Sequence, residues 1–188
     1  MENEILITVN KKDERFLRKK TVDFNFSEHS AKEVRELIAR MRRIMKAANG
    51  VGLSANQIGL PYRMFVAEVP DGQGGTKFYA VFNPRLEKAS EETAPFEEGC
   101  LSVPGKWGSV VRPERVVIVG LDKHGKPAKV KAWGLLARVF QHELDHLDGK
   151  LFIDRTKDIH DAEEEAARAA AKSAAEDEAP DGGARRKK

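Results

Sequence analysis

The chain is poor in cysteine and has no long hydrophobic run. Cys100 is the single cysteine among 188 residues, so the chain cannot form an internal disulfide. No apolar run approaches the roughly 20 residues that a membrane-spanning helix requires. The opening sequence MENE is acidic, unlike a signal or transit peptide. We therefore expect a cytoplasmic protein with no membrane partner, in which Cys100 is a reduced thiol.

An excess of one charge is also missing. Lys and Arg number 33 against 30 Asp and Glu, and the resulting net charge of +3 at pH 7 is too small to require DNA as a partner. With 40% hydrophobic and 34% charged residues, the composition supports one domain with a substantial core and some solvated sequence.

The end of the chain differs in composition from the rest. From Asp161 onward the residues are mostly Ala, Glu, Lys and Arg, without a large apolar side chain. We expect a folded domain over residues 1–158. At 159–188 we expect a solvated alanine-rich helix and then a disordered basic tail that ends in RRKK.

Two helices are predicted from apolar spacing. Ser30 and Glu33 form a capping-box signature before a run whose apolar residues recur every three or four positions as far as Ala48. A second run, over 135–147, has similar spacing, contains no proline and ends near Gly149.

Antiparallel strands are predicted around these helices. The runs at 63–69 and 78–82 are joined by a glycine-rich turn at 71–75, and the runs at 115–121 and 128–133 read as a hairpin. Two helices among several such strands give an α+β fold, with antiparallel sheets packed around the second helix.

The sequence QHELDH at 141–146 is the most informative feature of the chain. His142 and His146 are four residues apart and share one face of a helix, which is a metal-binding spacing. Glu143 follows the first histidine, where it could face a metal-bound water without being a ligand. Short patterns of this kind also occur by chance on ordinary helices. A metal site is therefore indicated only if the chain also offers a third ligand.

Cys100 is the remaining candidate for that ligand. One class of zinc protease would have a third histidine at position 152, where this chain has Phe152. Another class takes a downstream glutamate, but residues 163–165 lie in a segment with little to hold them rigidly. A lone cysteine is most often a small buried hydrophobe. Here Gly99 allows a close approach of the backbone, and one Cys with two His leaves a fourth position for water, as in a catalytic site.

The sequence GVGLSANQ at 50–57 follows the first helix. Its glycines leave the main chain bare for contact with an extended ligand, and Gln57 could donate a hydrogen bond to a developing oxyanion. Gly-x-Gly after a helix usually marks a C-cap and a turn. It is not a dinucleotide-binding fingerprint, because it follows a helix and lacks the third glycine.

Together, these three segments resemble the peptide deformylase family. That family carries the patterns Gly-x-Gly-Leu-Ala-Ala-x-Gln, Glu-Gly-Cys-Leu-Ser and Gln-His-Glu-x-x-His in this order. The chain has them at 50–57, 98–102 and 141–146, and the resemblance runs from about residue 5 to about residue 154.

The chain departs from the family pattern in three places. Ser54 stands where alanine is usual, Asn56 stands where proline is common, and residues 8–13 replace a proline-rich opening. We expect none of these residues to touch a metal ligand or Glu143. They would then affect the shape of the pocket and an N-terminal strand rather than the activity.

The resemblance implies a role for each matching residue. The implied metal ligands are Cys100, His142 and His146, the implied general acid/base is Glu143, and the implied oxyanion donors are the Gln57 side chain and the Leu101 N–H. The implied substrate-binding residues are Val51, Gly52, Gly99, Leu135 and Val139. Of these, Val51, Leu135 and Val139 would line a pocket for a methionine side chain.

The resemblance also implies the reaction. It predicts a hydrolase that removes the N-formyl group from the formyl-methionine of nascent polypeptides and releases formate, with a metal-bound water as nucleophile. Fe(II) is the implied native metal, and Zn(II), Ni(II) or Co(II) also suit one Cys with two His. The implied partner is a formyl-methionyl nascent peptide, and the basic tail suggests a transient association with the ribosome.

Two other hypotheses use the same residues. A metal-dependent endopeptidase would cut internal, unformylated peptides and would keep its activity after Cys100→Ser. A non-catalytic module with a structural metal would tolerate Glu143→Ala in any assay. Neither hypothesis explains Gln57 together with the segment at 99–101.

Overall fold

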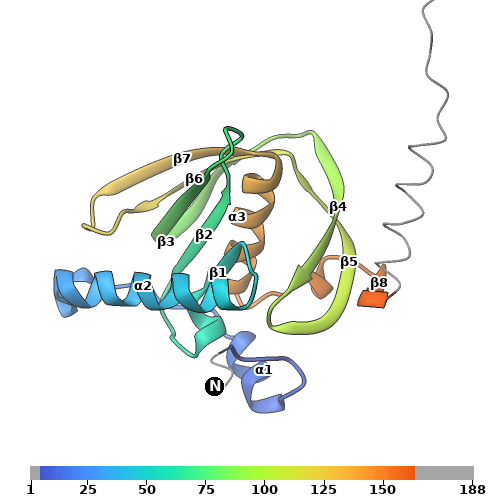
Figure 1. Ribbon diagram of the computed structural model, residues 1–188, viewed down its shortest axis with the longest axis horizontal. Coiled ribbons are helices and arrows are strands. Elements are labelled where there is room, and N and C mark those ends of the chain that lie inside the picture. Colours follow the sequence, from blue (N-terminus) through green and yellow to red (C-terminus); the bar gives the residue numbers. More distant parts are fainter. Residues whose placement is uncertain (1–4, 164–188) are drawn as a thin grey trace, which may run out of the picture.

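The computed structural model describes residues 5–163, and two antiparallel sheets and a central helix dominate it (Figure 1). The helices are α1 (Lys11–Leu17), α2 (Ala31–Ala47) and α3 (Gly134–Leu147), with 3-10 turns at Phe26–Glu28, Ala55–Ile58 and Phe152–Asp154. The strands are β1 (Gly52–Ser54), β2 (Met64–Pro70), β3 (Thr76–Ala89), β4 (Thr93–Cys100), β5 (Val103–Pro113), β6 (Arg115–Leu121), β7 (Pro127–Trp133) and β8 (Ile159–Asp161). The predicted α+β class is confirmed.

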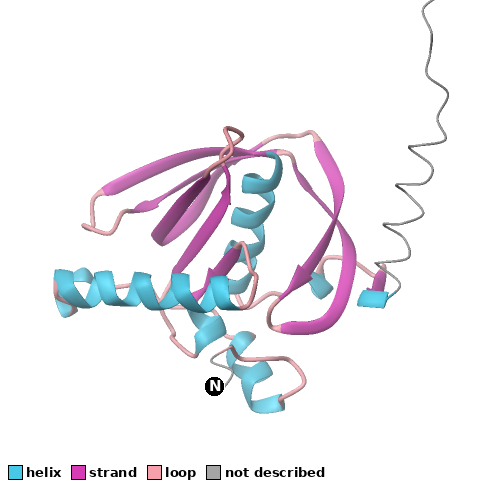
Figure 2. Ribbon diagram, in the orientation of Figure 1, coloured by secondary structure: helices cyan, strands magenta, loops and turns pink. Residues whose placement is uncertain are grey.

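The strands form two separate sheets. The larger has the order β1-β2-β3-β6-β7 and the smaller the order β4-β5-β8, and every pairing is antiparallel. Figure 2 shows α3 between the larger sheet and the β4–β5 hairpin. Within residues 5–163, β1 and β4 are edge strands of their sheets. Each therefore has one edge without a strand partner.

The central position of α3 follows from its sequence. Ala137, Phe140 and Leu147 are fully buried, and polar residues of the same helix are buried with them, so the helix has little solvent-facing surface. Phe140 packs against Phe65 of β2 and Tyr79 of β3, which fixes α3 against the larger sheet. The polar residues of α3 consequently face the smaller sheet and β1.

The first long helix starts and ends close to where the sequence predicts. The Ser30 side chain accepts from the Glu33 N–H, and the Glu33 carboxylate accepts from the Ser30 N–H, which is the expected capping box. The helix buries Val34, Met41 and Met45 in the core. It delivers the chain directly to the glycine-rich segment and β1.

The structure differs from the sequence prediction at both ends of the folded part. The segment expected to contain an N-terminal strand instead holds α1, which Asn10 caps by accepting from the Lys12 and Asp13 backbone. At the other end, β8 pairs with residues 106–108 of β5. The strand pairing therefore extends three residues beyond the expected boundary at 158. Most of the segment at 159–188, for which an alanine-rich helix and a basic tail were expected, lies outside the described residues. Over residues 5–163, none of the helices combines the length and the apolar character needed to span a bilayer.

Candidate metal centre and active site

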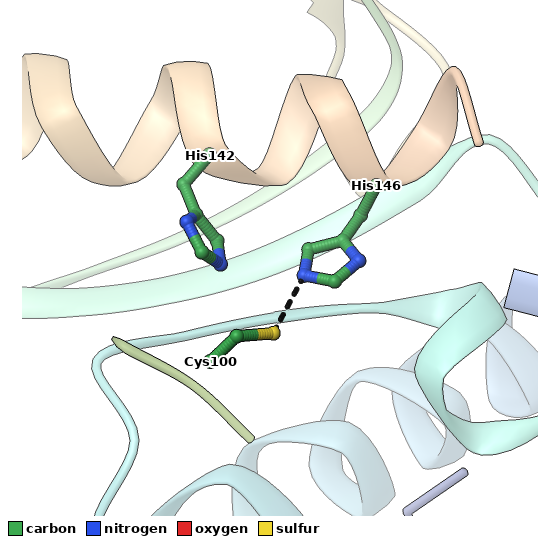
Figure 3. Close-up of side chains that lie close together, drawn as sticks. All are labelled: Cys100, His142 and His146. Atoms are coloured by element: carbon green, nitrogen blue, oxygen red, sulfur yellow. Dashed lines mark hydrogen bonds between the residues drawn. The ribbon is translucent and has the colours of Figure 1, made fainter. Parts of the chain in front are cut away.

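Three potential metal ligands meet between α3 and the end of β4. The ligand atoms of Cys100, His142 and His146 all lie within 4.8 Å of one another. Figure 3 shows both imidazoles projecting from α3 toward the thiol, with His146 Nε2 3.1 Å from Cys100 Sγ. The four-residue spacing places the histidines on one helix face, and a register shift between Gly99 and Cys100 re-aims the strand at the cysteine. One thiol and two imidazoles within this span are a donor set that fits a divalent transition metal.

The Glu98 carboxylate fixes the orientation of the His142 ring through the ring's Nδ1 atom. His142 Nδ1 lies 2.9 Å from Glu98 Oε2, which leaves the other ring nitrogen for the cluster. Arg112 binds both oxygens of the same carboxylate, at 2.6 and 2.9 Å, and Arg138 lies 3.1 Å from it. Burial alone would raise the pKa of Glu98, but the hydrogen bonds from His142 and Arg112 outweigh it and lower the pKa to about 2. Glu98 is thus a permanently charged anchor for the histidine.

A second buried carboxylate, Asp145, stabilises α3 between the two histidines. Arg112 Nη1 donates to Asp145 Oδ2 at 2.7 Å and Arg155 Nε to the same oxygen at 2.9 Å, while Arg155 Nη2 donates to Oδ1. Arg112 therefore ties Glu98 of β4 to Asp145 of α3. This network could not be predicted from sequence, because nothing local links Arg112 or Arg155 to the metal motif.

The ionisation of His146 suits a metal ligand. Burial, together with the positive charge of His142, holds the pKa of His146 well below its usual value. His146 is therefore neutral at physiological pH, as a ligand must be. Burial also disfavours a charge on His142, but its bonds to Cys100 and Glu98 prevail and raise its pKa well above the usual value. A cation bound among the three ligand atoms would compete with that proton.

Glu143 is buried beside the cluster, in contact with Ser54 and Gly52 of β1. It is 3% exposed, and burial raises its pKa to about 7. The Ser54 hydroxyl donates to Glu143 Oε2 at 2.7 Å. On the other side, a Cβ added at Gly52 would lie 2.3 Å from Glu143 Oε1, so only glycine leaves room for this carboxylate. The structure thus presents a carboxylate that titrates near neutral pH.

The Ser54 contact corrects one expectation. We expected neither Ser54 nor Asn56 to touch a metal ligand or Glu143, and this is wrong. Ser54 bonds Glu143, and Asn56 Nδ2 donates to the backbone carbonyl of His146 at 2.7 Å. Both departures from the family pattern therefore lie against α3, where the Ser54 hydroxyl and Asn56 Nδ2 donate hydrogen bonds that alanine and proline side chains could not make.

Gln57 has a fixed orientation near Cys100. Its Oε1 accepts from the Ser54 N–H at 2.8 Å, so its Nε2 must point the other way. Nε2 donates to the Ser102 hydroxyl at 3.1 Å and lies 3.8 Å from Cys100 Sγ. Ser102 N–H in turn lies 3.4 Å from that sulfur. A hydrogen-bond donor is consequently held next to the cluster.

A cavity of about 630 Å³, called the inner cavity below, opens onto these groups. Ten of the eleven site residues predicted from sequence line it, namely Val51, Gly52, Gln57, Gly99, Cys100, Leu101, Leu135, Val139, His142 and Glu143. The eleventh, His146, lies deeper and is 1% exposed. The cavity is also lined by Phe96, Trp107 and Arg138, which the sequence analysis did not select.

Comparisons with known proteins agree on one family. Residues 6–162 match the family model described as polypeptide deformylase. A peptide deformylase of Treponema pallidum is 48% identical over 123 residues, covering 65% of this chain and 73% of that protein. The crystal structure of a probable peptide deformylase from synechococcus phage S-SSM7 has a TM-score of 0.72 and 38% identity, over 81% of this chain and 98% of that one. A peptide deformylase from Synechococcus elongatus, solved in complex with actinonin, has a TM-score of 0.71 and 33% identity, over 82% and 78%.

Proposed function

The chain belongs to the polypeptide deformylase family, and from that premise we propose how its own residues remove a formyl group. It is a metal-dependent enzyme that deformylates nascent peptides. The proposed substrate is a peptide that begins with formyl-methionine, and the products are formate and a free amino terminus. The single observation that supports this assignment best is the buried Glu143, with a pKa of about 7, beside the Cys100, His142 and His146 cluster.

Cys100, His142 and His146 would hold the metal. Fe(II) is the proposed native ion, and Zn(II), Ni(II) or Co(II) also suit this donor set. When bound, such an ion supplies Lewis-acid chemistry, lowering the pKa of water and polarising a carbonyl. Glu98 keeps the His142 ring in position for this role, since its carboxylate fixes the Nδ1 side of the ring at 2.9 Å.

Glu143 moves the proton. With a pKa of about 7 it can accept a proton from the attacking water and return it to the departing amine near neutral pH. Ser54 orients the carboxylate through Oε2, and Gly52, which has no side chain, leaves room for Oε1 at the wall of the inner cavity. The same group can therefore act first as base and then as acid.

Gln57 and Leu101 stabilise the oxyanion that forms when the formyl carbon is attacked. The Gln57 amide is oriented in advance by Ser54 and Ser102, so it loses little freedom when it donates to the oxyanion. Leu101 directly follows Cys100 and lines the inner cavity, which supports a role for its backbone N–H as the second donor. Removal of one such donor typically raises the barrier by about 3–4 kcal/mol.

The substrate lies between β1 and β4. Both are edge strands, and an extended peptide can pair with such an edge through its backbone. Val51, Gly52 and Gly99 offer backbone on the two sides of the inner cavity. Leu135 and Val139 of α3, with Val51, provide apolar walls for the methionine side chain.

Formate release from formyl-Met-Ala-Ser tests the proposal, with protein purified without oxygen. The wild type should release formate and Glu143→Ala should not, while both retain metal. Glu91→Ala, which removes an exposed carboxylate outside the inner cavity, is the matched control and should behave as wild type. Cleavage of unformylated internal peptides would instead support an endopeptidase. Unchanged behaviour of Glu143→Ala in every assay would support a structural metal.

We further propose that the enzyme works in the cytoplasm and associates with the ribosome through its basic tail at 180–188. The tail has four consecutive basic residues and a nascent chain is the substrate. Deletion of residues 180–188 should weaken salt-dependent cosedimentation with ribosomes. Binding that survives the deletion would contradict this part of the proposal.

A further inference from the structure

A second hollow, called the outer cavity below, lies at the amino-terminal end of α3. Its volume is about 500 Å³, and it is formed by the start of β4, the turn between β5 and β6, and the junction of β7 with α3. Its apolar lining includes Pro95, Phe96, Pro113, Trp133 and Leu135. Trp133 is 71% exposed, Phe96 56% and Leu135 43%. Large apolar side chains gathered at one exposed place indicate a binding surface.

The outer cavity continues the inner cavity. Phe96, Leu135 and Arg138 line both. Arg138 makes their shared wall rigid, because its guanidinium donates to the carbonyls of Ala94 and Val110 at 2.7 Å each and lies 5.8 Å from the centre of the Phe96 ring. The two cavities are therefore neighbouring parts of one surface that runs from the metal cluster toward the start of α3.

Two independent lengths estimate the distance from the cluster to Phe96 and Leu135, the wall shared by the two cavities, at which the outer cavity begins. Along β4, Phe96 precedes Cys100 by four residues, about 13 Å at the usual strand rise. Along α3, Leu135 precedes His142 by seven residues, about 10 Å at the usual helix rise. An extended peptide advances about 3.3 Å per residue. A chain whose first residue lies at the cluster thus reaches the outer cavity with its fourth or fifth residue.

We infer that the outer cavity is a second substrate subsite, which binds an apolar or aromatic side chain at the fourth or fifth position of the nascent peptide. This inference rests on the proposed function, since it needs the formyl end of the peptide at the metal cluster. The occupant is the substrate itself, because a nascent chain necessarily continues past the inner cavity and the free edge of β4 leads it to Phe96. Trp133 and Phe96 supply flat apolar surfaces for that side chain.

A series of formylated hexapeptides tests the inference. The parent is formyl-Met-Ala-Ser-Ser-Ser-Ser, and a single Phe replaces the residue at position three, four, five or six. Phe at position four or five should raise kcat/KM by about five- to tenfold, chiefly through a lower KM. Phe at position three or six should have little effect. A flat profile across all four positions would overturn the inference.

Trp133→Ala supplies the specific variant, because Trp133 lines the outer cavity and not the inner one. It should abolish the preference for Phe while leaving hydrolysis of formyl-Met-Ala-Ser unchanged. Leu86→Ala, which removes another exposed apolar side chain that lines neither cavity, should keep the preference. A preference that persists in Trp133→Ala would overturn the inference. So would a change in solution molecular mass on Trp133→Ala without a change in the peptide profile, because the occupant would then be a second copy of the chain.

Failure of the proposed function gives a different result. If the enzyme were not a deformylase, formyl-Met-Ala-Ser and the whole hexapeptide series would remain uncleaved. If only the subsite were wrong, formyl-Met-Ala-Ser and every hexapeptide would be deformylated at similar rates.

Discussion

Replacing Ser54 by alanine should shift the pH dependence of the reaction. The hydroxyl donates to Glu143 Oε2 at 2.7 Å between two buried side chains and so favours the ionised carboxylate. A hydrogen bond to a charged group contributes about 1.5–3 kcal/mol, and 1.36 kcal/mol corresponds to one pKa unit. Ser54→Ala should therefore raise the pKa of Glu143 from about 7 by a further one to two units, roughly.

The sign of the effect on rate follows from the role of Glu143. A protonated carboxyl cannot accept a proton, so the acid limb of the kcat/KM profile should move to higher pH. We expect about a five- to fiftyfold loss at pH 7 that recovers in alkaline buffer. Formate release from formyl-Met-Ala-Ser, measured across pH at equal metal content, checks this. Ser27→Ala removes an exposed hydroxyl on another element and should leave the profile unchanged.

Two results would refute the reasoning. An equal loss of rate at every pH would mean that the hydroxyl does not act through the ionisation of Glu143. A higher KM with an unchanged kcat and an unchanged acid limb would mean that Ser54 acts on substrate binding instead.

Three further predictions concern the same site. Glu98→Gln removes the anionic anchor of His142 and should weaken metal affinity by about 10- to 100-fold, measured by competition with a chelator; unchanged affinity would contradict the anchoring role. Glu143→Gln should stabilise the metal-free protein, because folding raises the pKa of Glu143 from 4.5 to about 7. The ionised carboxylate therefore lowers the free energy of unfolding by nothing below pH 4.5, by an increasing amount between these values and by at most about 3 kcal/mol above pH 7. The variant's gain in denaturant midpoint should accordingly appear at pH 8 and vanish near pH 4. Gly52→Ala would put a Cβ 2.3 Å from Glu143 Oε1 and should lower kcat by at least about 100-fold, while circular dichroism shows the fold retained; near-normal activity would show that the carboxylate can be held elsewhere.

The long helices and the metal motif could be predicted from sequence because their signals are local. Ser30 and Glu33 cap α2 within one turn, and the histidines of α3 are four residues apart on one face. The pairing of β6 with β7 was equally local, since a short turn joins the two strands. In each case the interacting residues are close neighbours in the chain.

The rest depends on contacts between distant parts of the chain. Strand β4 has mostly exposed or half-exposed residues, so it lacks the alternating pattern by which a strand is found. The role of Arg112 arises only when β5 passes beside α3 and places one guanidinium between Glu98 and Asp145. α1 has one buried residue, Leu17, and its N-cap is its main local signal.

The short strand β8 also sets a limit on how the protein can be shortened. Its His160 lies opposite Trp107 of β5, and the Trp107 ring packs against Gly99, where an added Cβ would lie 3.1 Å from it. Gly99 directly precedes Cys100. A protein cut at residue 158 would lose the strand that supports Trp107, and we expect it to bind metal more weakly and to be cleaved more readily by proteases in β5. Fusion partners and affinity tags are therefore best attached after Asp161.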